Sequence, residues 1–372
     1  MFRKHNSKPL RITFFFELVS LALIASSCGH TQASPPQVSM DVVMKTVHDY
    51  GSGHAGLLSP GSSAKPEEND EPYTAHINSL LMQQDFGELE RIAKQNRTEK
   101  GRVLGGYWKN HEFFSATRSP HHVGLVKDSD YLDQIKTLNK WIAAYPESAT
   151  ARISLANLYA NYANFARGSG YANTVTDSQW QLFYQRTDLA KELLLEAARL
   201  KERDPNWYFA MQQVAHNEGW SKSEARDLLD QAISFEPGYY HFYRMYAQYL
   251  LPQWYGQPGD ILAFAEEISS RFPEPDSSIL YFQIVSSLAC YCEEAMADLG
   301  HVSYSKVRQG YTNLTRLYGT SNLTANRFAF MATTIRDKPS AHEAFAAIVT
   351  MDSDIWYSEA VFDSARDWAE SP

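Results

Sequence analysis

The feature that most constrains the fold is a helix–turn–helix pattern that occurs twice in succession over residues 204–273. In the first unit, apolar residues recur at i, i+3, i+4 and i+7 over residues 207–214, which is the stripe of an amphipathic helix. Gly219 interrupts this stripe, and a second stripe follows over residues 225–232. Pro237 ends the unit, because proline cannot continue the interior of a helix. This stretch therefore predicts two helices joined by a tight turn.

The second unit repeats the same order of elements. Its stripes cover residues 239–246 and 261–268, a loop over residues 252–259 separates them, and Pro273 ends the unit. Helix–turn–helix units of about 34 residues that end at proline are typical of tetratricopeptide-like arrays. We therefore expect an all-α fold, an irregular tetratricopeptide-like helical-repeat solenoid of antiparallel helix pairs. The same stripe spacing recurs in a longer helix over residues 180–197, and the proline that follows it is farther away than in the first unit. The helices therefore have unequal lengths, and the array is irregular.

Helix starts are marked by residues whose side chains satisfy the free N–H groups of a first turn. Two capping boxes, at residues 176–179 and 221–224, are of this kind, and Ser148 is a further cap. Additional helices are expected at residues 77–92 (a hairpin of two), 130–145, 148–165, 278–299, 303–318, 323–335, 339–349 and 355–369.

The N-terminal segment combines a basic stretch, an apolar run and a cysteine. Residues 1–11 are basic, and residues 12–24 form an apolar run that is too short to span a bilayer as a helix. Small residues then precede Cys28, an arrangement that resembles the lipobox of bacterial lipoproteins, in which the cysteine is lipidated and becomes the new N-terminus. The resemblance implies a signal peptide over residues 1–27 and a lipid anchor on Cys28 in the bacterial cell envelope, at the outer membrane facing the periplasm or at the cell surface. The alternative is secretory cleavage near Ala33, which leaves a soluble secreted or periplasmic protein.

Composition divides the remainder of the chain into two parts. Residues 28–72 are rich in Ser, Gly and Pro and predict a flexible tether, with one short helix over residues 40–47. Residues 73–372 are expected to form the helical-repeat domain. The formal net charge of −9 opposes binding to a phosphate backbone, so no nucleic-acid partner is expected, and membrane contact is expected through the N-terminal lipid only.

Motifs that usually carry chemistry are incomplete in this chain. Residues 51–56 match G-x-G-x-x-G, but the Leu-Leu-Ser-Pro-Gly that follows cannot open a helix onto a phosphate. Residues 303–306 match S-x-x-K without a later K-T-G, and the serine is expected to cap a helix. The acidic pairs in residues 128–130 and 352–354 are likewise expected to cap helices, and His121-His122 is expected in solvent. We expect no catalytic residue, no cofactor and no metal site.

The cysteines do not predict a disulfide framework. Cys290 and Cys292 would point to nearly opposite sides of a helix, so they cannot form a disulfide with each other there. Both are expected to be small, buried or half-buried apolar side chains.

Aromatic residues are abundant, with 8 Trp, 22 Tyr and 19 Phe, and most lie on helical stripes. A few lie in loops instead, where recognition residues are common. The candidates in the two glycine-containing loops are Arg167, Tyr171, Trp254 and Tyr255. The alternative is that these side chains only anchor their loops.

Several short segments are distinctive as a set, namely residues 86–90, 166–172, 174–175, 207–208, 219–220, 236–240 and 249–256. Together they resemble one bacterial family, a domain of unknown function that is number 4034 in its series. The resemblance covers roughly residues 73–272 and implies a tetratricopeptide-like helical fold. It implies no reaction.

Two functions follow from these observations. The first is a non-catalytic, envelope-anchored helical-repeat scaffold that mediates interaction with an unknown protein partner. The alternative is a surface lipoprotein that binds glycans through exposed aromatic side chains, with glycan cleavage as its less favoured version. Cleavage needs two carboxylates about 5–9 Å apart in a groove. The carboxylates available near the two units are Glu218, Glu224, Asp260 and Glu266.

Overall fold

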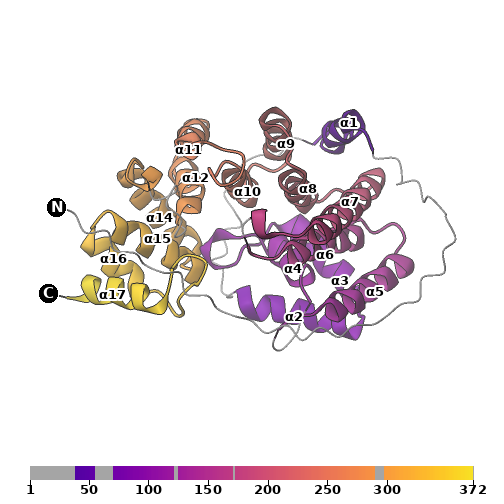
Figure 1. Ribbon diagram of the computed structural model, residues 1–372, viewed down its shortest axis with the longest axis horizontal. Helices are drawn as coiled ribbons and strands as arrows, with labels where there is room; N and C mark the ends of the chain where they lie inside the picture. The colour runs from indigo at the N-terminus through magenta and orange to yellow at the C-terminus, as the bar shows by residue number, and fades with distance from the viewer. Residues whose placement is uncertain (1–37, 55–69, 121–124, 171, 290–296, 372) are drawn as a thin grey trace. The chain divides into compact units, whose positions relative to one another are not determined.

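The computed structural model describes residues 38–54, 70–120, 125–170, 172–289 and 297–371. The chain divides into Met1–Ser39 and Met40–Pro372, and the described helices lie in the second unit. In chain order (Figure 1) they are α1 Met40–Tyr50, α2 Asp70–Gln83, α3 Phe86–Glu99, η1 Leu104–Gly106, α4 Lys109–Thr117, α5 Asp128–Ala144, α6 Ala149–Arg167, η2 Ala172–Thr174, α7 Asp177–Arg199, α8 Pro205–Glu218, α9 Lys222–Phe235, α10 His241–Tyr249, α11 Asp260–Ser270, α12 Asp276–Val285, η3 Ser286–Leu288, α14 Tyr304–Tyr318, α15 Asn322–Thr334, α16 Lys338–Phe345 and α17 Glu359–Glu370.

The all-α fold class is confirmed. Within the described residues the chain forms helices, and strand-like pairing is limited to an isolated antiparallel bridge between Arg102 and Trp108. Helix α8 packs on α9, α9 on α10, and α11 on α12, so helices that are adjacent in the sequence contact each other. The solenoid arrangement of these pairs stays a prediction. Across the described part of the chain, none of the helices has the length and apolar character needed to cross a membrane.

The two repeated units contain the helices that their stripes predicted. In the first unit, α8 ends at Gly219, which adopts the left-handed conformation with φ 66°, and α9 begins with the predicted capping box of Ser221 and Glu224. The second predicted capping box, Thr176 with Gln179, starts α7. Local side-chain chemistry therefore placed these helix ends correctly.

Two helices in the C-terminal half and one nearer the middle of the chain differ from the expected helices. The helix expected over residues 278–299 ends as α12 at Val285 and continues as the 3-10 turn η3. The predictions for Cys290 and Cys292 lie outside the described residues, as do those for Cys28 and His121-His122. The last helix begins four residues later than expected, because the hydroxyl of Ser358 accepts the N–H of Val361 and caps α17 there.

The third difference is α4, which no periodic stripe predicted. Most of its residues are buried, polar ones included, so it has no polar face that contrasts with an apolar one. It packs against α2, α6 and α8 in the interior of the unit (Figure 1). Helix α4 is central to the fold and also supplies side chains to a large cavity.

The segment that leads into α4 is fixed by Arg102. This side chain is buried and its guanidinium lies over the rings of Trp108, Tyr240 and Tyr318, at 5.4, 4.7 and 4.9 Å from their centroids. It donates hydrogen bonds to the carbonyl oxygens of Gly106 (2.6 Å) and Gly238 (3.0 Å). The start of α4 is thereby attached to the start of α10 and to the end of α14.

The start of α8 is fixed by Asp204, whose side chain is fully buried. Its Oδ1 accepts the N–H of Asn206 at 2.8 Å and so caps α8. Its Oδ2 accepts hydrogen bonds from Nη1 of Arg97 and from Nδ2 of Asn110, both at 3.1 Å. One carboxylate therefore joins α3, α4 and α8.

The short helix expected within the tether docks at the same place. Helix α1 buries Val43, Val47 and Tyr50, and the Tyr50 ring stacks on Trp207 of α8 with centroids 4.1 Å apart. The backbone N–H of Asp204 donates to the Tyr50 hydroxyl at 2.8 Å. The apolar side of α1 is thus part of the core, whereas residues 55–69 lie outside the described residues.

Replacing Asp204 by alanine should destabilise the whole unit. The substitution removes the cap of α8 and the charged hydrogen bond from Arg97, which keeps Glu202 as a partner, so we expect the free energy of unfolding to fall by about 3–5 kcal/mol. The exposed i,i+3 pair of Asp133 and Lys136 provides a matched control, and Asp133→Ala should cost less than about 0.5 kcal/mol. Urea unfolding followed by circular dichroism measures both. Equal effects of the two substitutions would contradict the central role of Asp204.

Candidate functional site

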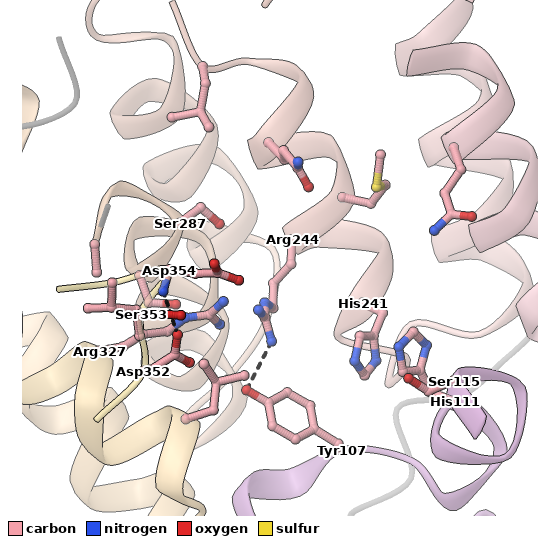
Figure 2. Close-up of a pocket in the computed structure, with 18 of the residues that line it drawn as sticks. Tyr107, His111, Ser115, His241, Arg244, Ser287, Arg327, Asp352, Ser353 and Asp354 are labelled. Carbon is pink, nitrogen blue, oxygen red and sulfur yellow. Dashed lines mark hydrogen bonds between the residues drawn. The ribbon is translucent and has the colours of Figure 1, made fainter. Parts of the chain in front are cut away.

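A cavity of about 860 Å³ lies where α4, α8, α10, η3, α15 and the loop before α17 meet. Its volume is within the range of about 300–1,000 Å³ that is usual for ligand pockets. Its wall contains histidine, arginine and acidic side chains from segments far apart in the sequence (Figure 2). We call this cavity the polar pocket.

Two stacked histidines form one wall of the polar pocket. The imidazole rings of His111 on α4 and His241 on α10 are nearly parallel, with centroids 3.3 Å apart, and both are buried. The Nδ1 atom of His111 lies 3.3 Å from the hydroxyl of Tyr239, and Phe209 packs edge-on against both rings. Among the described residues, Nδ1 of His241 has no hydrogen-bond partner. This imidazole therefore retains unused hydrogen-bonding capacity inside the protein.

Burial keeps both imidazoles neutral. It lowers the pKa of His111 and of His241 well below the usual value, because a charged ring would lose its hydration. The nearby positive charges of Arg118 and Arg244 lower both pKa values further, and His241 is affected by His111 as well.

Three arginines supply the positive charge of the pocket. Arg244 on α10 donates from Nη1 to the hydroxyl of Tyr107 at 2.9 Å. Arg327 on α15 has a buried Nη1 without a hydrogen-bond partner among the described residues, and burial together with the charge of Arg244 lowers its pKa to about 10. Burial also lowers the pKa of Arg118, which follows α4, while the charge of Glu112 opposes that shift. In the described part of the chain, neither Arg244 nor Arg327 forms an ion pair with a carboxylate.

The acidic residues of the pocket lie mainly on the loop before α17. The charges of Asp352 and Asp354 raise the pKa of Arg327, in opposition to the effects of burial and Arg244. The Oδ1 atom of Asp352 accepts the N–H of Asp354 at 2.9 Å, which closes a local turn. The prediction that this acidic pair caps a helix is therefore wrong, since Ser358 caps α17. The third carboxylate, Glu112 on α4, is buried beside His111.

The other acidic pair behaves as predicted. Asp130 accepts the backbone N–H of Lys127 at 2.8 Å in the first turn of α5.

The S-x-x-K match lies at the start of α14. Its serine, Ser303, is at the N-cap position without a side-chain capping bond, and Lys306 pairs with Glu266.

One set of residues at the pocket could hold a metal ion. His111, Glu112 and His241 each offer a ligand atom, and these atoms lie within 4.8 Å of one another. However, imidazole lone pairs lie in the ring planes, and the two parallel rings would have to turn before both could point at a single ion. The neighbouring arginines also oppose a cation. The arrangement is better suited to an anion.

The structure brings two of the predicted recognition residues together. The guanidinium of Arg167 lies over the rings of Trp180 and Trp254, at 5.6 and 5.7 Å from their centroids. Trp254 also lines the polar pocket, and 38% of its surface is exposed. Tyr255 instead anchors its loop, because its hydroxyl donates to the carbonyl oxygen of His216 at 2.8 Å. Tyr171 lies outside the described residues, and a recognition role for any of the four stays a prediction.

The carboxylates considered for glycan cleavage have other partners. Glu218 pairs with Lys191, Glu224 belongs to the capping box of Ser221, Asp260 pairs with Lys222, and Glu266 pairs with Lys306. None of these four carboxylates lines the polar pocket.

The histidines and arginines of the pocket were missed by sequence reasoning. His111 and His241 are 130 positions apart, and Arg327 is a further 86 positions away, so no spacing rule connects them. The only indication in the sequence was indirect: polar residues such as His241 and Arg244 lie between the apolar positions of the stripe over residues 239–246.

The buried histidines make stability depend on pH, which we expect to see between about pH 7 and pH 5. The folded-state pKa values lie below the value of about 6.5 for an exposed histidine, and for His216 burial lowers the pKa to about 4. The unfolded chain therefore binds more protons in this range, and the free energy of unfolding should fall as the pH falls below 6.5.

The measurement is the thermal unfolding midpoint across this range for the parent chain and two variants. His241→Gln should reduce the acid-induced loss, whereas His342→Gln, which removes an exposed histidine, should follow the parent. Identical curves for the parent and His241→Gln would contradict the expected contribution of His241.

Comparison with known proteins finds a similarity to one protein family over part of the chain. No curated protein and no solved structure matches this chain. A family model matches residues 73–220, a region that includes α3 to α8 and the pocket residues His111, Glu112 and Phe209. The resemblance proposed from the sequence is confirmed over this region, while its extension to residue 272 stays a prediction. The family whose model matches residues 73–220 is described as "Domain of unknown function (DUF4034)", and the chain is similar to it over this region.

Proposed function

We propose that this protein is a non-catalytic binding scaffold, anchored in the bacterial cell envelope, that holds a protein partner at the polar pocket. The observation that carries the proposal is the combination of arginines with exposed aromatic rings around one cavity. Trp254 and Tyr357 line the pocket and are 38% and 72% exposed, and the pocket arginines Arg244 and Arg327 are half-buried. Trp, Tyr and Arg are the residue types most enriched among those that dominate the energetics of protein interfaces.

The glycan-binding alternative is retained because of Trp254. An exposed tryptophan at the mouth of a polar pocket can stack on a sugar ring, and the pocket offers donors and acceptors for hydroxyl groups. Both versions use the same surface, so one experiment can separate them. The cleaving version has less support, because the four carboxylates considered for it are engaged elsewhere.

Site-specific photo-crosslinking in the native host tests the proposal. A benzoylphenylalanine at position 357 should give an adduct of defined mass that proteases digest, whereas one at Leu132, which is 49% exposed on α5 and does not line the pocket, should not. Trp254→Ala should weaken the adduct at position 357. A protease-resistant adduct that glycosidases degrade would support the glycan alternative instead. The same adducts at both positions, or none at position 357, would overturn the proposal for this surface.

The anchor is a separate part of the proposal and rests on Cys28. Growth with a labelled fatty acid should label the full chain and leave Cys28→Ser unlabelled and outside the membrane fraction, because acyl chains anchor through about 0.8 kcal/mol per buried CH₂ group. Ser27→Thr, which keeps the cysteine, serves as the control and should remain labelled. A Cys28→Ser chain that is still membrane-bound would contradict the anchor.

A further inference from the structure

We propose that the polar pocket binds an oxyanion group, a carboxylate or a phosphate, between Arg244 and Arg327. This inference rests on the proposed function only in taking the polar pocket as the ligand site. It adds the chemical class of the group that enters the pocket, which neither the family match nor the sequence supplies.

Two positive charges enter the same space from different helices. Figure 2 shows the guanidinium groups of Arg244, from α10, and Arg327, from α15, directed toward one another across the pocket. Like charges at close range repel, and the repulsion is greater inside a protein than in water. An anion placed between them would replace this repulsion with two attractions.

The guanidinium groups of Arg244 and Arg327 also have N–H donors that are available to a ligand. A guanidinium has five N–H donors. The described contact of Arg244 through Nη1 is with the hydroxyl of Tyr107, and the buried Nη1 of Arg327 has no partner among the described residues. A buried donor without a partner is unfavourable, so an anion that accepts from Nη1 of Arg327 would be stabilising, and the half-buried guanidinium of Arg244 can donate to the same anion.

The acidic residues of the pocket loop do not provide that acceptor. Asp354 is exposed, and Asp352 is half-buried with Oδ1 engaged by a backbone N–H. Neither forms an ion pair with Arg327. An incoming carboxylate or phosphate can accept two parallel N–H bonds from a guanidinium, and this geometry is well matched to arginine.

The buried histidine wall adds a second polar group that can bind a ligand. His241 is 8% exposed, lines the pocket, and has a Nδ1 atom with no hydrogen-bond partner among the described residues. It is stacked on His111, which faces the same cavity. An oxyanion that reaches this wall can accept a hydrogen bond from the imidazole when that ring carries its proton on Nδ1.

The size of the pocket indicates that the oxyanion belongs to a larger molecule. A cavity of about 860 Å³ is much larger than an isolated phosphate or acetate. Phe209, Trp254 and Ile355 provide apolar surface in its wall, which suits the carbon skeleton of an organic acid or phosphate ester, or an acidic side chain of a bound partner.

Isothermal titration calorimetry and thermal unfolding of the full chain, solubilised in detergent, test the inference with inorganic phosphate and citrate as probes. Phosphate and citrate distinguish the two sources of the oxyanion, and binding of either supports the proposal. We expect a rise in the unfolding midpoint with anion concentration, because a ligand that binds only the folded state stabilises it. Arg327→Gln and Arg244→Gln should each weaken binding about tenfold or more, the loss expected for a charge-assisted hydrogen bond. Arg366→Gln, an exposed arginine on α17, is the matched control and should bind as the parent does.

Arg327→Met separates an anion site from a purely structural arginine. Without anion, this variant should unfold at the same temperature as the parent or higher, because it removes a half-buried charge that has no ion-pair partner among the described residues and whose Nη1 is buried without an acceptor. With anion, it should lose the stabilisation that the parent gains. Absence of binding by both probes, or equal binding by the parent and Arg327→Gln, would overturn the inference. Failure to find a protein partner at position 357 would leave anion binding intact, so the two outcomes are distinguishable.

Discussion

The architecture depends on one buried carboxylate. Asp204 caps α8, accepts hydrogen bonds from Arg97 on α3 and Asn110 on α4, and through its backbone holds Tyr50 of α1. A buried charge is tolerated only when its lone pairs are satisfied, so these four elements must approach in one relative arrangement. Asp204 therefore provides specificity that apolar packing alone does not.

The same network extends to the polar pocket. The Asn110 side-chain oxygen lies 3.4 Å from the hydroxyl of Tyr239, and this hydroxyl contacts Nδ1 of the adjacent His111 at 3.3 Å. Tyr239 also precedes α10, which carries His241 and Arg244. The carboxylate that caps α8 is thus connected, through two polar side chains, to the histidine wall of the site.

Electrostatics distinguish the pocket from the rest of the unit. Arg97 and Lys191, for example, pair with the carboxylates of Asp204 and Glu218, whereas Arg244 and Arg327 have no carboxylate partner among the described residues and face each other. Groups held against their electrostatic preference are characteristic of binding and active sites. For this reason we propose the pocket, rather than the aromatic loops alone, as the binding site of the protein.

By itself, the sequence determined the helical class, the two repeated units and most helix ends, because stripes, capping boxes and glycine stops act over a few residues. Ser221 with Glu224, Gly219 and the docked segment around Val43 were all predictable in this way. Only the tertiary structure decided which polar residues share a cavity. His111, His241 and Arg327 come together because α4, α10 and α15 pack against common neighbours, and long-range packing leaves no periodic signal in the residues it joins.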